Sequence, residues 1–205
     1  MTIPFIDLAT QQRRLRPEID ARINKVLDHG RYIMGPEIDE LEANLCKRLN
    51  VKHTISCSSG TDALILGLLG LGVKPGDGVI VPSFTFAASA EAIAVLGAVP
   101  IFAEVEEISF NLDPDRLADA LAAGQKAGLN VVGVIPVGLF GQPAMLDRIA
   151  TFSQGNGLWM LDDAAQSFGA ALSENLVGTF GSATATSFFP AKPLGCYGDG
   201  GALFT

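Results

Sequence analysis

The sequence predicts an α/β protein with a mainly parallel, doubly wound sheet. From residue 52 onward, short apolar or β-branched runs alternate with longer stretches of helical composition, which is typical of parallel strands joined by helices. Some runs are apolar throughout, such as residues 131–135 (VVGVI), as expected for strands covered by helices on both faces. The chain has 205 residues, of which 48% are hydrophobic and 18% charged, so one large core is expected.

Two amphipathic helices are expected before the first strand. Between Pro17 and Leu49, apolar residues recur at helical spacing in two segments, separated by a turn at His29-Gly30. Pro36 suits the first turn of the second helix, because proline lacks an N–H and has a helical φ angle.

Seven strands are expected after these helices. They are predicted at residues 53–57, 78–82, 99–105, 130–137, 157–162, 183–189 and 201–205. Segments of helical composition, such as residues 87–96, 114–123 and 145–153, link the first five. In sheets of this kind ligands bind beyond the carboxyl ends of the strands. Functional residues are therefore sought directly after each strand.

Charge, hydropathy and cysteine content argue against several protein classes. The net charge of −8 provides no positive field for nucleic acid or anionic lipid, so no nucleic-acid partner is expected. The longest apolar stretch, residues 64–73, contains three glycines and is shorter than the ~20 residues of a membrane span, so no membrane association is expected. The N-terminus lacks a secretory signal pattern, which predicts a cytoplasmic location. Three scattered cysteines and two histidines predict reduced thiols and no metal site.

The turn after the first predicted strand is a candidate anion site. Residues 58–64 (SSGTDAL) lead from that strand into an apolar helix. Backbone N–H groups at the helix start, together with the hydroxyls of Ser59 and Thr61, would form a cradle for an anion. Taken alone, these residues are more typical of an ordinary helix cap followed by a buried helix.

Aromatic and acidic residues follow two further strands. Residues 82–89 (PSFTFAAS) place two aromatics among small side chains, either to stack on a planar ring or to pack beneath a loop. Asp162 and Asp163 close an apolar strand, and a buried carboxylate requires a partner. That partner is a protonated heterocycle nitrogen or a structural arginine. A glycosidase carboxylate pair is disfavoured, because adjacent strand residues point to opposite faces.

Lys192 is the lysine of a long apolar and glycine-rich segment, residues 187–201 (SFFPAKPLGCYGDGG). Desolvation there favours the neutral amine that a Schiff-base lysine needs, although a solvated surface lysine is the common alternative. An anion cradle, a stacking aromatic, a strand-end carboxylate and a lysine are together the groups that hold pyridoxal phosphate (PLP). The helix start takes the phosphate, the carboxylate takes the pyridinium nitrogen, and the lysine takes the aldehyde.

The sequence resembles the DegT/DnrJ/EryC1/StrS family of PLP-dependent nucleotide-sugar aminotransferases over essentially the whole chain. The most specific stretch is SFFPAKPLG at residues 187–195, followed by GDGG at 198–201, and FIDL at 5–8 and GPE at 35–37 also match. The resemblance implies the large domain of the PLP-dependent transferase fold type I. Residues 1–205 are expected to form this PLP-binding domain, truncated before the smaller C-terminal domain of the family.

The resemblance also implies roles for individual residues. Lys192 would form the imine with the cofactor and shuttle a proton, while Asp163 would keep the ring nitrogen protonated. Asp162 stands where relatives often carry glutamate and is expected to be structural. Tyr32 and Gly35 would lie near the sugar or amino-donor pocket. The remaining cofactor contacts are expected from Ser59, Gly60, Thr61, Phe86, Gln166 and Ser187.

The activity implied by this resemblance is ping-pong amino transfer. Glutamate, as the expected donor, would convert the cofactor to pyridoxamine phosphate, which then aminates a keto group of a nucleotide-diphosphate sugar. The motif KPLGCY at residues 192–197 most resembles the corresponding segment of enzymes that aminate UDP-2-acetamido-2-deoxy-3-oxo-glucuronate for surface-polysaccharide synthesis. Lys192 argues against the dehydratase subset of the family, which carries histidine at this position. A homodimer with shared active sites is implied.

Two other functions remain open from the sequence. One is a catalytically silent domain of the same family that binds cofactor weakly or serves only in assembly. The other is a Rossmann-type nucleotide-binding protein, which is disfavoured because no GxGxxG turn follows the first predicted strand.

Overall fold

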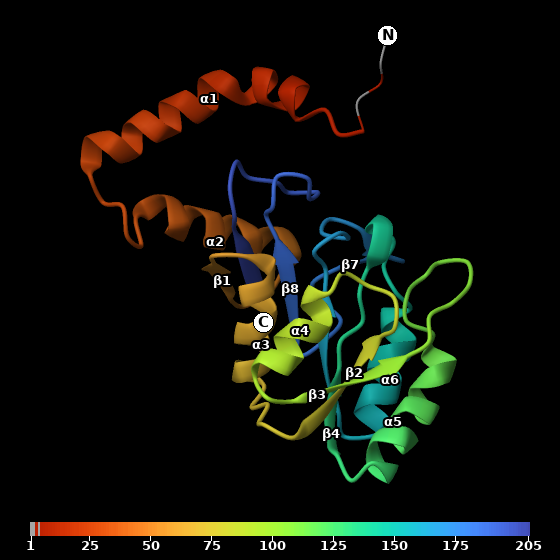
Figure 1. Cartoon of the computed structure of the whole chain (residues 1–205). Helices are drawn as coiled ribbons and strands as arrows, with labels where there is room; N and C mark the ends of the chain where they lie inside the picture. Colours follow the sequence, from red (N-terminus) through yellow and green to blue (C-terminus); the bar gives the residue numbers. More distant parts are fainter. Residues whose placement is uncertain (1–2, 4) are drawn as a thin grey trace.

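The predicted α/β architecture is confirmed. The computed structural model describes residue 3 and residues 5–205, and seven strands form one sheet in the order β1-β9-β8-β5-β4-β2-β3 (Figure 1). The strands of this sheet are β1 (Thr54–Cys57), β2 (Asp77–Pro82), β3 (Val99–Ala103), β4 (Asn130–Val134), β5 (Trp159–Asp163), β8 (Ala183–Ser187) and β9 (Gly201–Phe204).

The sheet is parallel except at β9. Strands β3, β2, β4, β5 and β8 pair in parallel, whereas β9 is antiparallel to both β8 and β1. Every other strand therefore runs in the same direction, and their carboxyl ends lie along one edge. This edge is where the sequence places its candidate site residues.

Helices cover both faces of the sheet. On one face, α3 (Gly60–Gly70) and α4 (Ala88–Val95) pack on a core that includes Val79, Val81 and Leu161. The opposite face carries α5 (Leu117–Lys126) and α6 (Leu146–Gly155), packed on Ile80 and Met160. Neighbouring residues of one strand thus enter different cores, because side chains alternate along a strand.

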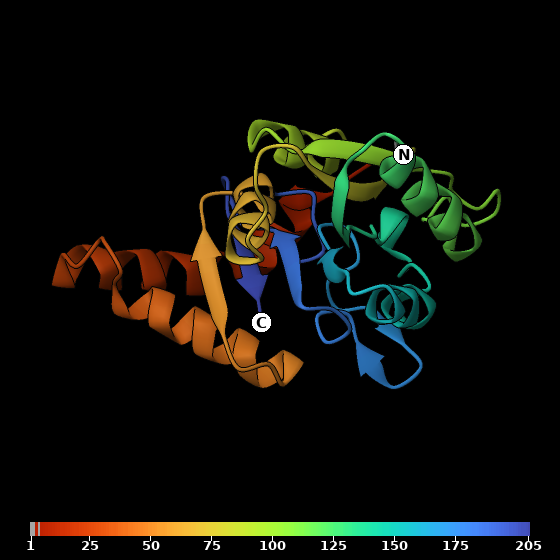
Figure 2. The same ribbon diagram turned by 90° about the horizontal axis from the view of Figure 1, so that it is seen from below.

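Helices α1 (Leu8–His29) and α2 (Pro36–Leu49) lie together at one end of the molecule (Figure 2). Leu49 of α2 packs against Phe204 of β9. By contrast, none of the residues of α1 is buried, and this helix is tied to α2 by ion pairs such as Lys25–Glu37, at 3.2 Å. Exposed ion pairs of this kind contribute little stability.

Several boundaries differ from the sequence predictions. Helix α1 begins at Leu8, well before Pro17, because Asp7 caps it by accepting a hydrogen bond from the Thr10 N–H. It ends at His29, and Gly30 caps it with a φ of 67°, as the expected turn requires. The predicted strand at 130–137 stops at Val134. The structure adds a short hairpin, β6 (Ala171–Leu172) and β7 (Asn175–Leu176), which is too short to leave a periodic pattern.

None of the helices within residues 3 and 5–205 has both the length and the apolar run that a bilayer crossing requires.

Candidate functional site

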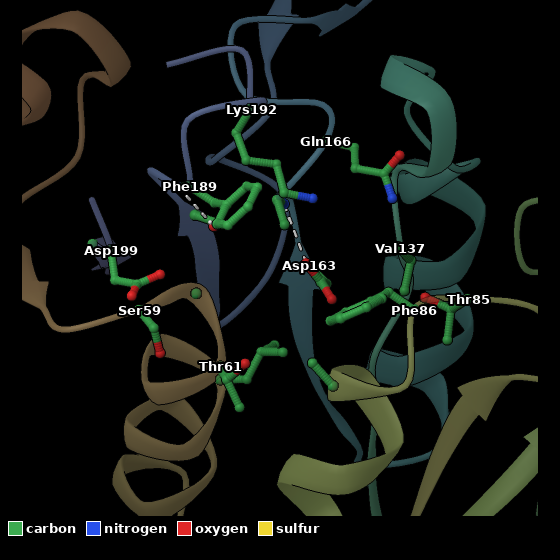
Figure 3. Close-up of a pocket in the computed structure, with 16 residues that line it drawn as sticks. Ser59, Thr61, Thr85, Phe86, Val137, Asp163, Gln166, Phe189, Lys192 and Asp199 are labelled. Atoms are coloured by element: carbon green, nitrogen blue, oxygen red, sulfur yellow. Dashed lines mark hydrogen bonds between the residues drawn. The ribbon is translucent and has the colours of Figure 1, made fainter. Parts of the chain in front are cut away.

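A pocket of about 320 Å³ opens where several strands and helices meet at the carboxyl edge of the sheet. This volume suits a small-molecule ligand, and Figure 3 shows the side chains that line it. The pocket brings together residues from all four predicted segments. The sequence-predicted residues in its lining are Ser59, Gly60, Thr61, Phe86, Asp163, Gln166, Ser187 and Lys192.

The start of α3 forms one wall of the pocket. The Ser59 hydroxyl accepts a hydrogen bond from the Asp62 N–H and donates to Asp62 Oδ2, both at 3.0 Å. Ser59 is thus the helix cap, and its hydroxyl proton is already used. The N–H groups of Gly60 and Thr61 have no acceptor within the helix, since they lie in its first turn. They remain available to an anion, which the helix dipole also favours.

Gly60 brings this helix start against the end of β8. A Cβ atom at Gly60 would lie 2.6 Å from the Cβ of Ser187, closer than two carbon atoms can approach. Ser187 is buried, and its hydroxyl oxygen accepts a hydrogen bond from the Phe189 N–H at 3.2 Å. Its hydroxyl proton remains free to be donated. Because of this close approach, the N–H groups at the start of α3 and the Ser187 hydroxyl at the end of β8 lie around one space that is large enough for an anion.

Replacing Gly60 by alanine is expected to weaken PLP binding by at least about tenfold. The added methyl group must push α3 away from Ser187 and so lengthen the hydrogen bonds to the phosphate, each of which contributes roughly 1.5–3 kcal/mol. Titration of cofactor absorbance measures the affinity. Gly70→Ala, at the other end of α3, is the matched control, since a Cβ there meets nothing within 4 Å. Equal affinities in the two variants would contradict a phosphate site at this helix start.

Asp163 is the buried carboxyl group of the pocket. Its Oδ2 accepts a hydrogen bond from the Ser89 hydroxyl at 2.8 Å, and its Oδ1 accepts one from the Ala165 N–H at 3.2 Å. Burial raises the pKa of Asp163 above its usual value, although both hydrogen bonds and the charge of Lys192 act to lower it. The two hydrogen-bond donors are neutral, so a cationic N–H group in the pocket would stabilise the carboxylate.

Lys192 lies in the loop between β8 and β9 and is half-buried. Its backbone N–H donates to the Phe189 carbonyl at 2.8 Å, which turns the chain at the pocket. Figure 3 shows the Lys192 side chain pointing into the pocket between Phe189 and Gln166, with Asp163 below it. An amine and a carboxyl group thus lie in one small cavity. PLP requires both, because its aldehyde bonds covalently to an amine and its ring nitrogen forms an ion pair with a carboxylate.

Gln166 and Phe86 occupy the remaining sides of the pocket. The Gln166 side-chain oxygen accepts a hydrogen bond from the Phe140 N–H at 3.1 Å. Phe140 belongs to the short helix η2 (Leu139–Gly141) and has a positive φ of 59°, so this contact holds a strained turn beside the pocket. Phe86 is 70% exposed. Its ring is therefore available to stack on a ligand.

Sequence reasoning missed some lining residues and included two that the pocket does not contain. Thr85, Val137 and Asp199 line the pocket as well, and each lies in or beside a segment that follows a strand. Tyr32 is 66% exposed, and Gly35 caps α2. Neither lines the pocket, so their predicted substrate role stays a prediction.

The pocket residues fit PLP by chemistry. The lining offers backbone and hydroxyl donors for a phosphate, a buried carboxyl for a protonated ring nitrogen, an amine for an aldehyde, and an exposed aromatic face. Within residues 3 and 5–205, no group of three or more His, Cys, Asp or Glu residues is placed to hold a metal ion.

Comparison with solved structures gives the same fold. The chain matches an aminotransferase from Brucella abortus with a TM-score of 0.96 and 48% identity, covering 100% of this chain and 55% of that one. It matches NtdA from Bacillus subtilis, solved with bound cofactor PMP, with a TM-score of 0.90 and 30% identity over 100% of this chain and 45% of that one. The chain is thus an α/β protein with the fold of the matching part of these aminotransferase structures.

The chain belongs to the DegT/DnrJ/EryC1/StrS aminotransferase family, whose model matches residues 13–205. It is similar to the UDP-2-acetamido-2-deoxy-3-oxo-D-glucuronate aminotransferase of Pseudomonas aeruginosa, with 48% identity over 203 residues. That match covers 99% of this chain and 55% of the relative. The chain thus spans about half the length of the relatives it matches.

Proposed function

We propose that this chain forms the cofactor-binding large domain of a PLP-dependent sugar aminotransferase. The enzyme moves an amino group from glutamate to a keto group of a nucleotide-linked sugar. The observation that carries the proposal is the convergence of Lys192, Asp163 and the start of α3 on one pocket. The 48% identity to the Pseudomonas aeruginosa enzyme supports a UDP-linked 3-keto sugar acid as the acceptor.

Each pocket residue has a specific task in this proposal. PLP, when bound, supplies an electron sink for the carbon that loses a proton. Gly60, Thr61 and Ser187 hold the phosphate group through N–H and O–H donors. Asp163 holds a proton on the ring nitrogen through its carboxylate, and Phe86 covers one face of the ring.

Lys192 performs the proton transfers. Its Nζ is the amine that would bond the aldehyde carbon of PLP, and it would be a free amine once the amino donor is bound. As a free amine, Nζ would take the proton from the donor carbon and pass it on within the pocket. In the first half-reaction glutamate would pass its amino group to the cofactor, and water would supply the keto oxygen of 2-oxoglutarate. In the second, the keto sugar would take the amino group and its oxygen would leave as water.

A homodimer with shared active sites is part of the proposal. The support is the apolar surface around and beyond the pocket. Phe86 and Phe140 are 70% and 69% exposed, and Ile23 and Leu27 of α1 are 53% and 59% exposed. Exposed apolar surface of this extent is typical of protein interfaces, because its burial is favourable by about 25 cal/mol per Å².

A half-reaction tests the function directly. The protein, saturated with PLP, is mixed with glutamate without any sugar, and 2-oxoglutarate is quantified. The expected result is one equivalent per bound cofactor, together with loss of the visible absorbance. Covalent binding of PLP without any 2-oxoglutarate would favour the alternative, a silent cofactor-binding domain. Failure to bind PLP at all would refute both of these and leave only a domain that serves in assembly.

A further inference from the structure

Asp162, the neighbour of Asp163, is buried on the opposite face of the sheet. It is 1% exposed. Met160 and Ala164 contact the core beneath α5 and α6, whereas Leu161 contacts the core beneath α3 and α4. By the alternation of a strand, Asp162 lies with Met160 and Ala164, away from the pocket. It does not line the pocket.

The Asp162 carboxyl group has no hydrogen-bond partner within residues 3 and 5–205. Both oxygens are buried without a donor. Thr184 stands directly across from it on β8, is also 1% exposed, and likewise has a hydroxyl without a partner. Two unsatisfied polar groups side by side are costly, unless one of them can donate to the other.

No cation faces Asp162 from the elements that pack on β5. Strands β4 and β8 carry no charged residue. Helix α3 carries only Asp62, and α6 carries only Asp147 and Arg148. Asp119 and Lys126 of α5 and Glu174 of the β6–β7 turn are all exposed. Arg148 is exposed and forms an ion pair with Asp115. Two charges shift the pKa values of the two carboxyl groups. Asp163 raises the pKa of Asp162, and Lys192 lowers the pKa of Asp163 from the pocket side.

The two buried carboxyl groups of Asp162 and Asp163 can together carry one negative charge at low free-energy cost, but not two. Asp163 has two hydrogen-bond donors and the nearby Lys192 charge, whereas Asp162 has none of these. Burial and the charge of Asp163 raise the pKa of Asp162 to about 8. The Thr184 hydroxyl across the strands makes no hydrogen bond to Asp162, so no donor within the described residues compensates for a charge on this carboxyl group.

We propose that Asp162 is a neutral, proton-bearing carboxylic acid in the folded protein and a positioning residue that leaves the negative charge of the pair on Asp163. The consequence for catalysis rests on the proposed function, because only a bound cofactor ring needs the charge at Asp163. The protonation itself is a property of the folded chain.

The dependence of stability on pH tests the proposal. Above about pH 4 the unfolded chain loses the Asp162 proton, while the folded chain keeps it up to about pH 8. Wild-type stability therefore falls with rising pH in this window. The Asp162→Asn variant cannot ionise at this position. The ratio of its folding equilibrium constant to that of the wild type should therefore rise by up to about tenfold per pH unit until pH 8 and be constant above that pH. Urea unfolding followed by Trp159, the only tryptophan, measures it.

Asp77→Asn is the matched control. Asp77 is also buried, but its oxygens accept hydrogen bonds from the Lys74 N–H and the Asn130 side chain, both at 2.8 Å. This variant should be less stable than wild type at every pH, without the widening difference. A constant difference for Asp162→Asn, or stabilisation of wild type alone by added K⁺, would overturn the proposal, because either result indicates an ionised Asp162.

A measurement on the unaltered protein covers the case in which Asp162→Asn does not fold. Infrared difference spectra should show a protonated carboxyl band at pH 7 that disappears above about pH 9, and absence of this band at pH 7 would overturn the proposal. Covalent PLP attachment is measured in the same samples. If no attachment occurs, the proposed function fails, while the protonation of Asp162 is judged by the stability and infrared results alone.

Discussion

Replacing Lys192 by alanine is expected to abolish covalent attachment of PLP and to lower amino transfer by about 10⁴-fold or more. The variant loses both the nucleophile for the aldehyde and the base for the proton transfers, and a positioned base alone contributes about 10²–10⁴-fold. Borohydride reduction followed by peptide mapping should place the label on Lys192 in the wild type and show only background labelling in the variant.

Two control variants make this result specific. Lys126→Ala removes an exposed lysine at the end of α5 and should label as the wild type does. Lys192→Arg keeps the positive charge near Asp163 but has no neutral amine at working pH, so it should bind PLP without covalent attachment. Label on another lysine in the wild type would show that the assignment of Lys192 is wrong.

Replacing Asp163 by asparagine is expected to leave covalent attachment to Lys192 in place and to slow the glutamate half-reaction by about 10²–10³-fold. An amide cannot supply the negative charge that keeps the ring nitrogen protonated, and removal of one such electrostatic group costs about this factor. Stopped-flow absorbance after glutamate addition measures the rate. Equal rates in the two proteins would contradict the role of Asp163.

The pH profile provides a second test of Asp163. Its raised pKa means that the carboxylate is lost as pH falls through that value, so the wild-type rate should decline on the acid side, and Asp163→Asn should lack this decline. Ser89→Ala removes a hydrogen bond that lowers the pKa of Asp163, so the decline should move to higher pH. Ser153→Ala, which removes a buried hydroxyl without a partner, controls for the loss of a buried serine.

Much of the fold could be predicted because its signals are local and long. Apolar strands such as β2 (Asp77–Pro82) are buried at every position, and this burial leaves a continuous hydrophobic run. The β6–β7 hairpin and the start of α1 at Leu8 were missed for a physical reason. Two-residue strands have no period, and one capping contact from Asp7 decides where that helix begins.

The candidate site was predictable to the extent that it follows strand ends. Lys192 and Asp163 were singled out because they follow strands whose carboxyl ends meet at one edge, whereas Ser187 was expected from the family resemblance. The sequence did not distinguish the lining roles of Thr85 and Asp199, because residues of these types follow many strands without facing a pocket.

By itself, the sequence determined which chemical groups this protein has and near which strand ends they lie. It also determined that Asp162 and Asp163 point to opposite faces, because that follows from the period of a strand. Only the tertiary structure decided which of these groups are free to react. It tied the Ser59 hydroxyl to Asp62, gave Asp163 its donors and left Asp162 without any. Hydrogen-bond partners and burial come from residues distant in the chain, and they set which carboxyl carries the charge.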